Sequence, residues 1–282
     1  MCDQISCNNS GNASGNSTDN PLPRATDEHR RAFIKGLMAL PLAVVLADPG
    51  LAQAAAQRMS AVEIKLPGGG KAEGYLALPS NVNGEAPTVL LIHEWWGLND
   101  QIKAVANEFA EQGFIALAID LYQGQVASSR EQANNYRKAM SEEWATAALV
   151  GAIDWLRNYQ GSNGKVGTIG WCFGGGWSLN AALAAPVDAA VIYYGDVRKS
   201  AAELQSLSGP VLGHFGTLDK RINAEMVGGF QREMAKAGKD DLEINWYTAD
   251  HAFANPSGAR YDDDDAQLAW SRTLAFFYQH LR

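Results

Sequence analysis

The sequence predicts an α/β protein with a mostly parallel sheet of about eight strands and helices on both faces. Short apolar runs alternate with stretches of helical periodicity after residue 88, which is the order that a parallel sheet requires. The polar candidates for function each come directly after one of these apolar runs. Open α/β sheets place their sites at the carboxyl ends of strands, so this second observation predicts the same architecture independently.

The elements are predicted from local patterns taken in chain order. A hairpin is expected first, with strands Val62–Leu66 and Tyr75–Leu78 on either side of a glycine-rich turn. Short runs rich in apolar and β-branched residues predict further strands at Thr88–Ile92, Phe114–Ile119, Val166–Ile169, Ala189–Tyr194, Val211–Phe215 and Glu243–Tyr247. Apolar residues three and four apart predict helices at Asp100–Gln112, Glu131–Asn158, Gly174–Ala185, Asn223–Ala237 and Ala266–Leu281. The aspartate run 262–265 is expected to begin the last of these helices, where negative charge suits the helix dipole.

Composition and charge bound the function. The 282 residues carry a net charge of −8 and no basic run, which argues against nucleic acid or an anionic membrane surface as a partner. Residues 1–28 are polar and rich in Asn, Ser and Gly, a composition that does not bury enough apolar surface to fold. We expect residues 1–54 to be a leader that is removed, and residues 55–282 to form one catalytic domain.

The leader resembles a twin-arginine (Tat) export signal. Arg30 and Arg31 precede a moderately apolar stretch at 36–47, and Ala52-Gln53-Ala54 has the small-x-small form of a signal-peptidase site. The apolar stretch is too short for a stable membrane anchor. This interpretation predicts a bacterial protein exported to the periplasm or beyond, with the Tat machinery as a transient partner. The alternative is an ordinary amphipathic N-terminal helix.

The most informative segment is Gly170-Trp171-Cys172-Phe173-Gly174-Gly175, directly after the apolar run Val166–Ile169. Glycines two positions on either side of Cys172 let a strand and a helix approach closely, so that the turn residue is forced into a strained conformation with its side chain exposed. This pattern is typical of the nucleophile elbow of an α/β-hydrolase, with cysteine in place of serine. The alternative is a structural glycine turn around a buried cysteine.

An elbow of this kind predicts an acid and then a histidine later in the chain. Asp219 comes after the strand-like run Val211–Phe215, and His251 lies in a loop after Glu243–Tyr247. We expect His251 to accept the thiol proton of Cys172 and Asp219 to orient the imidazole. Taken alone, Asp219 would be read as a turn or capping residue and His251 as a surface histidine.

The cysteines give no sign of a disulfide framework or a metal centre. The chain has three, and removal of the leader would take away Cys2 and Cys7 and leave Cys172 alone. Before removal, Cys2 and Cys7 could pair, but two cysteines alone are a poor metal signature. We expect no metal and no cofactor.

A second patch, His93-Glu94-Trp95-Trp96-Gly97-Leu98-Asn99, comes directly after the apolar run Val89–Ile92. Together with the cysteine elbow, Asp219 and His251-Ala252-Phe253, it closely resembles the dienelactone hydrolase (carboxymethylenebutenolidase) family over residues 61–281. The resemblance implies that Glu94 lies beside the cysteine and helps to generate the thiolate. It also implies that the backbone N–H groups of Trp95 and Phe173 form the oxyanion hole. Without the resemblance, Glu94 would be read as a loop carboxylate paired with a cation.

The same resemblance identifies departures from the family pattern. Arg130 matches the first of two arginines that hold a substrate carboxylate, although it would otherwise be read as a solvated helix charge. Asn134 and Asn255 replace the family's tyrosine and second arginine, and asparagine does not supply the charge of a guanidinium. Tyr136 is a candidate replacement for the tyrosine, and Trp96, like Trp95, is a candidate wall of the substrate pocket.

These patterns predict a thiol-dependent hydrolase of lactones or activated carboxylic esters, working through a Cys-His-Asp triad and a thioester. Its expected partner is a small-molecule ester or lactone. The loss of the second arginine leaves two alternatives: a non-catalytic binding module that keeps the fold, and an esterase acting on an unrelated cell-envelope or plant-derived ester. The patterns do not fix an oligomeric state.

Overall fold

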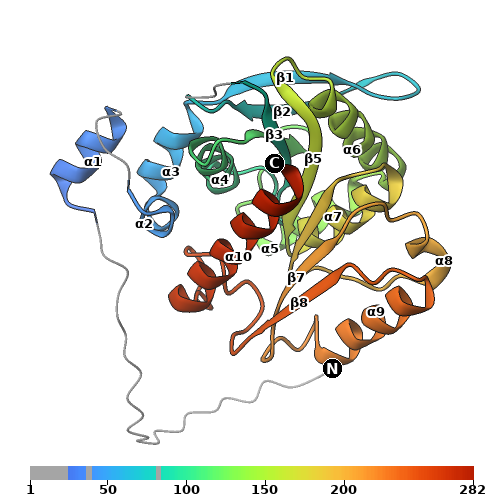
Figure 1. Cartoon of the computed structure of the whole chain (residues 1–282). Coiled ribbons are helices and arrows are strands. Elements are labelled where there is room, and N and C mark those ends of the chain that lie inside the picture. Colours follow the sequence, from blue (N-terminus) through green and yellow to red (C-terminus); the bar gives the residue numbers. More distant parts are fainter. Residues whose placement is uncertain (1–24, 36–39, 81–83) are drawn as a thin grey trace, which may run out of the picture.

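The computed structural model describes residues 25–35, 40–80 and 84–282. Within these residues, one sheet of eight strands has the order β1-β2-β4-β3-β5-β6-β7-β8. β1 pairs with β2, and β2 with β4, in antiparallel fashion, while the remaining neighbours are parallel. This is the α/β-hydrolase fold expected from the sequence (Figure 1).

Each strand lies within a few residues of its predicted position; β3, β5, β7 and β8 are longer than predicted, and β6 is one residue shorter. They are β1 Ser60–Lys65, β2 Lys71–Ala77, β3 Ala86–Ile92, β4 Ile115–Asp120, β5 Ser162–Trp171, β6 Ala189–Tyr193, β7 Val211–Gly216 and β8 Leu242–Tyr247. The helices are α1 Asp27–Ile34, α2 Leu42–Ala47, α3 Pro49–Ala56, α4 Asp100–Glu111, α5 Arg130–Ala139, α6 Glu142–Arg157, α7 Phe173–Ala184, α8 Ala201–Leu204, α9 Ala224–Lys236 and α10 Asp263–Leu281.

Two apolar cores lie on opposite faces of the sheet because successive strand side chains alternate between the faces. In β3, Leu90 and Ile92 join the core that is covered by α6, α7 and α9. Val89 and Leu91 join the other core, which is covered by α4 and α10. All four side chains have no exposed surface, so β3 lies in the middle of the domain.

The prediction of one long helix over Glu131–Asn158 is wrong, because the structure has two helices there, α5 and α6. The backbone of Met140 is extended, and the Ser141 side chain then accepts a hydrogen bond from the Trp144 amide as the N-cap of α6. A serine that can cap a new helix competes with continuation of the old one. The short α8 was not expected from the pattern, whereas α10 begins at the aspartate run with Asp262 as its N-cap.

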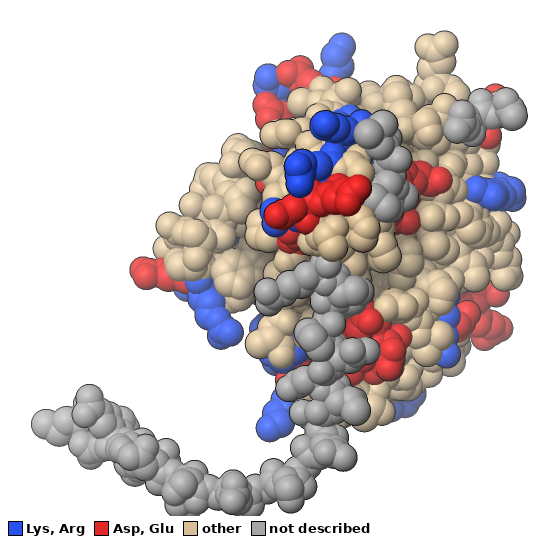
Figure 2. Space-filling view, turned by 90° about the vertical axis from the view of Figure 1, so that its left-hand side faces the viewer, with Lys and Arg blue, Asp and Glu red and all other residues tan. Residues whose placement is uncertain are grey.

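Helices α1, α2 and α3 lie together beside α4 (Figure 1). Their residues Phe33, Leu46 and Leu51 belong to the same core as α4, and Leu51 has no exposed surface. The predicted boundary between residues 54 and 55 falls inside α3, and processing there stays a prediction. On the face that carries these helices, acidic and basic side chains stand in small groups separated by uncharged surface (Figure 2).

None of the helices within the described residues has both the length and the apolar character needed to cross a membrane. Cys2 and Cys7 lie outside the described residues.

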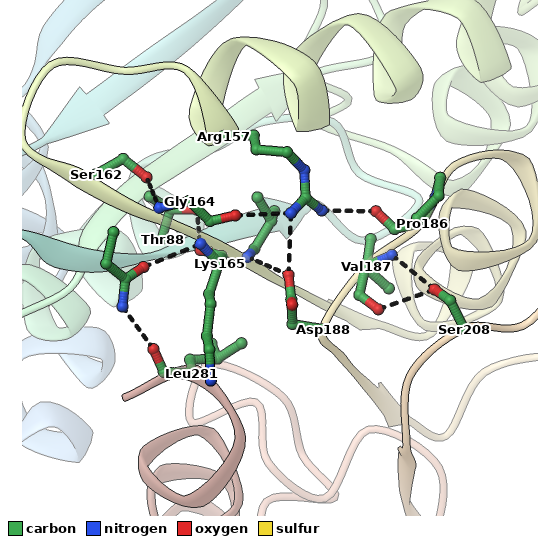
Figure 3. A network of polar contacts seen from close by, with 12 residues as sticks. Thr88, Arg157, Ser162, Gly164, Lys165, Pro186, Val187, Asp188, Ser208 and Leu281 are labelled. Atoms are coloured by element: carbon green, nitrogen blue, oxygen red, sulfur yellow. Dashed lines mark hydrogen bonds and ion pairs between the residues drawn. The ribbon is translucent and has the colours of Figure 1, made fainter.

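A polar network fixes the end of the sheet away from the candidate site, at the start of β5 and β6 (Figure 3). Asp188 Oδ2 accepts hydrogen bonds from the Val166 amide at 2.9 Å and from Arg157 Nη1 at 3.3 Å. Arg157 also donates to the carbonyls of Gly164 and Pro186 at 2.6 and 2.8 Å. One ion pair therefore joins the end of α6 to the starts of two central strands.

We predict that Asp188→Ala destabilises the protein, because it leaves the Val166 amide and the Arg157 guanidinium short of an acceptor. The expected loss is about 1–3 kcal/mol in the free energy of unfolding, measured by urea denaturation. Asp240→Ala, an exposed aspartate in the loop before β8, is the matched control and should change this free energy by less than about 0.5 kcal/mol. Equal effects of the two substitutions would contradict the structural role of Asp188.

Candidate active site

The turn from β5 into α7 holds Cys172 in a strained conformation. Its φ is +53°, a region that side chains other than glycine seldom occupy, and the thiol is partly exposed. A Cβ at Gly170 would collide with the Gly174 carbonyl, and one at Gly174 would collide with the Ile92 carbonyl. Both glycines are therefore required by close backbone packing, as an elbow predicts.

Two loops bring an imidazole and a carboxylate to this thiol. His251 lies after β8, and its Nε2 is 3.1 Å from the Cys172 Sγ. Its Nδ1 is 2.6 Å from Asp219 Oδ2, on the loop after β7. Asp219 Oδ1 accepts from the amides of Arg221 and Ile222 at 2.8 and 3.0 Å, so both carboxylate oxygens are used. The three side chains form one chain of hydrogen bonds at the carboxyl ends of β5, β7 and β8.

Opposing effects set the charge on this histidine. Burial lowers the pKa of His251, but the hydrogen bonds and charges of Asp219 and Cys172 outweigh burial and raise the pKa to about 9. Burial would raise the pKa of Asp219, yet the hydrogen bonds from His251 and the Ile222 amide bring that pKa below its ordinary value. The arrangement therefore favours an imidazolium between a carboxylate and the sulfur atom at neutral pH.

Glu94 lies on the loop after β3 with only 6% of its surface exposed. Its Oε2 accepts a hydrogen bond from Asn255 Nδ2 at 2.8 Å. Burial raises the pKa of Glu94, and the Asn255 bond together with the charges of His251 and Arg260 offsets this only in part. A carboxyl group with a raised pKa is suited to exchange a proton near neutral pH.

His93, to which the sequence assigned no role, fixes the Glu94 loop. Its Nε2 accepts from the Leu121 amide at 3.1 Å, so its Nδ1–H donates to the Glu94 carbonyl at 2.6 Å. Burial lowers the pKa of His93, which keeps the ring neutral, as this pair of bonds requires. Among the described residues, the Trp95 and Phe173 amides donate no hydrogen bond to another group, so both are free to meet a ligand oxygen.

The remaining candidates for substrate binding are dispersed. Asn255 contacts Glu94, and Trp96 packs against Trp95 with ring centroids 4.9 Å apart. Arg130 is exposed in the first turn of α5, and no contact between described residues joins it to the Cys172 group. Tyr136 is half-buried, and its ring packs 6.1 Å from that of Tyr122. Asn134 is exposed on α5, like Arg130.

Tyr194, directly after β6, is a site residue that the sequence did not reveal. Its φ is +39°, its ring lies 5.2 Å from that of His251, and it is 1% exposed. Its hydroxyl lacks a partner of good hydrogen-bond geometry among the described residues, although the Ala254 amide is near. The only signal in the sequence is its position at the end of a predicted strand.

His214 shows how a buried histidine behaves without a carboxylate. Its Nδ1 and Nε2 bond to the hydroxyls of Tyr247 and Thr273 at 2.8 and 3.1 Å, and burial lowers its pKa to about 3. Both of its ring nitrogens are therefore satisfied inside the core.

Comparison with known proteins connects this geometry to a family. The model of the dienelactone hydrolase family matches residues 72–281. The protein usf of Aquifex pyrophilus is 32% identical over 76% of this chain and 95% of its own length. A carboxymethylenebutenolidase of Pseudomonas putida is 31% identical over 70% of this chain and 87% of its own. A crystal structure described as a putative dienelactone hydrolase from Klebsiella pneumoniae is 27% identical, with a TM-score of 0.70, over 78% of this chain and 99% of its own.

We predict that Asp219→Asn lowers the pKa of His251 by at least about one unit from its value near 9, because the charge that stabilises the imidazolium is lost. The measurement is an NMR titration of the histidine ring signals. His214 is an internal control, since it should remain neutral from pH 5 to 10 in both proteins. A wild-type His251 that titrates near 6.5 would contradict the arrangement.

The upward shift in the pKa of His251 also determines how the free energy of unfolding depends on pH. Because the pKa of His251 is raised on folding, its contribution is fully present below about pH 6.5, the value of the unfolded chain. The contribution is lost as the pH rises through about 9. The free energy of unfolding of wild type should therefore exceed that of His251→Gln by more at pH 6 than at pH 9.5.

Proposed function

The chain belongs to the dienelactone hydrolase family and is a carboxymethylenebutenolidase-like hydrolase, and from this premise we propose that it acts through Cys172, His251 and Asp219. The observation that carries the proposal is the unbroken contact from sulfur to imidazole to carboxylate, at 3.1 and 2.6 Å. The proposed substrates are lactones or activated carboxylic esters.

In this proposal the cysteine thiolate attacks the ester carbonyl and forms a tetrahedral intermediate. The amides of Trp95 and Phe173 stabilise its oxyanion, a contribution of about 3 kcal/mol for each such donor. Collapse of the intermediate releases the alkoxide or enolate, which takes the proton held by His251, and leaves a thioester on Cys172. His251 then removes a proton from water as the water attacks the thioester, and the acid is released.

Glu94 is proposed as a second proton acceptor for the thiol. Its raised pKa reduces the cost of taking a thiol proton, and its place beside Asn255 and His251 brings it near the reacting groups. Asn255 is proposed as a positioning residue, because it holds one oxygen of Glu94 and leaves the other without a hydrogen bond among the described residues.

The substrate range depends on the sulfur nucleophile. In the tetrahedral intermediate, a thiolate leaves more readily than a simple alkoxide or an amine. Enol lactones and aryl esters have stabilised leaving groups, so they complete acyl transfer. Simple alkyl esters and amides are therefore expected to turn over slowly.

Export through the twin-arginine route remains a proposal. It is supported by Arg30 and Arg31, which lie on α1. Arg30 forms an ion pair with Asp48 at 3.3 Å, and its side chain is 43% exposed. Expression with and without Arg30→Lys and Arg31→Lys, and then fractionation of the cells, tests it: retention of the double variant inside the cell supports export by this route.

We predict that Cys172→Ala lowers kcat/KM for activated lactones and aryl esters at least about 1,000-fold, because no nucleophile remains. Assay of both proteins beside intact-protein mass spectrometry tests the thioester directly, since wild type should gain one acyl group and Cys172→Ala none. Iodoacetamide labelling across pH serves as the control for thiol reactivity. An unchanged rate in Cys172→Ala would refute the proposed mechanism.

A second prediction concerns how residue 255 selects the charge of the substrate. Asn255→Arg adds a cation beside the candidate site, where the family pattern has an arginine for a substrate carboxylate. We expect it to raise the ratio of kcat/KM for a carboxylate-bearing lactone over a neutral lactone at least about 10-fold. Asn255→Gln keeps the amide and is the matched control. Equal ratios in the two variants would show that residue 255 does not select the charge of the substrate.

A further inference from the structure

We propose that a pocket next to the Cys172 group receives the apolar, uncharged acyl half of the substrate and that α2 forms its outer wall. The proposal rests on the proposed function and specifies its substrate class. The pocket has a volume of about 530 Å³, within the range of small-molecule sites. It lies between α2 on one side, α4 and α10 on the others, and the loop that holds Glu94.

The pocket meets the candidate active site at Glu94, Tyr194 and Asn255, which line its wall. Tyr194 packs against the His251 ring at 5.2 Å, and Glu94 bonds to Asn255 at 2.8 Å. A group in the pocket is therefore one side chain away from the imidazole that contacts the sulfur. Cys172 and His251 do not line the pocket themselves, so it is a subsite adjoining the reacting atoms.

The walls select an uncharged, largely apolar group. The apolar side chains that line it include Leu42, Val44, Ile102, Val105, Trp171 and Trp270. No lysine, arginine or histidine is among the lining residues of the described chain, while Glu94, Glu108 and Asp263 are. An anion placed there would meet carboxyl groups and no cation, which is unfavourable in a pocket of low polarity.

Tyr194 is one of the polar residues of the wall. The Tyr194 hydroxyl is buried and lacks a partner of good geometry among the described residues. Such groups are rare in folded proteins because an unmade hydrogen bond costs free energy. An apolar pocket with a few convergent polar groups is the usual form of a small-molecule site.

The acyl half fits this location better than the leaving group does. In an acyclic ester the alcohol or enol departs before water attacks, so it needs a path to solvent, whereas in a lactone the ring-opened alcohol or enol stays attached to the acyl group. The acyl half stays bonded to sulfur through the thioester stage and gains from a pocket that holds it in place.

The outer wall depends on a segment that the sequence assigned to the leader. Leu42, Val44 and Leu46 of α2 line the pocket. Gln101 of α4 donates to the Leu46 carbonyl at 3.0 Å, and the N-cap of α3 comes directly after α2, with Asp48 accepting from the Gly50 amide at 2.9 Å. The pocket therefore belongs to the chain with residues 40–56 attached.

The test fills the pocket from its outer wall in the full-length chain. Ala43 lines the pocket, whereas Ala47 is exposed on the same helix and does not. We expect Ala43→Trp to lower the ratio of kcat/KM for 4-nitrophenyl octanoate over 4-nitrophenyl acetate at least 10-fold and Ala47→Trp to leave it within 2-fold. Ala266→Phe from the α10 wall, with exposed Leu268→Phe as its control, should repeat the result. An unchanged ratio in both pocket variants, or an equal fall in both controls, would overturn the proposal.

A binding measurement separates failure of this proposal from failure of the proposed mechanism. Octan-2-one is neutral and not hydrolysed, and ligand-observed NMR titration of the Cys172→Ala protein reports its affinity without catalysis. Adding Ala43→Trp to that protein should weaken binding at least 10-fold, and octanoate should bind Cys172→Ala at least 10-fold more weakly than octan-2-one. Equal affinities in either comparison would overturn the pocket assignment, even if ester hydrolysis proved independent of Cys172.

Discussion

The close packing of β5 against α7 is the constraint on which the site depends. Because Gly170 and Gly174 have no side chains, the backbones of β5 and α7 pack in direct contact. The turn between them holds Cys172 at a φ of +53°. Such strain costs about 1–3 kcal/mol and persists only where the surroundings enforce it. Here the enforcement comes from the buried central strands on either side of β5, so the position of the sulfur is set by the core.

Burial alone does not decide the charge of a buried histidine, because the groups that its ring contacts also matter. His214 and His251 are both buried, but His214 faces hydroxyl groups and has its pKa lowered to about 3. His251 faces a carboxylate and a thiol, and its pKa rises to about 9. The same low-polarity interior that penalises an isolated charge strengthens its attraction to an opposite one. At neutral pH the His214 ring is therefore neutral and the His251 ring is cationic.

Local pattern and chain order were enough to predict the sheet and the contacts at its edge. All eight strands lie within a few residues of their predicted positions. Cys172, Asp219 and His251, which the elbow motif and chain order identified as candidates, are in contact, while their catalytic roles stay a prediction. Features that exist only after folding were not predictable in this way. Helices as short as α2 and α3 are unstable alone and form because they pack on α4, which no local pattern records. The role of Tyr194 likewise arises from burial and an unusual φ for a non-glycine residue.

Two separate features support the proposal of an uncharged substrate. Residue 255 is an asparagine where the family pattern has an arginine, and its side-chain amide donates a hydrogen bond to Glu94. Beyond Glu94, the adjoining pocket offers carboxyl groups and aromatic rings, but none of its described lining residues is cationic. An arginine at 255 would have to be desolvated beside that apolar wall, whereas an amide is accommodated at lower cost. The loss of the cation and the apolar pocket are therefore mutually consistent, since each removes a reason for the site to bind an anion.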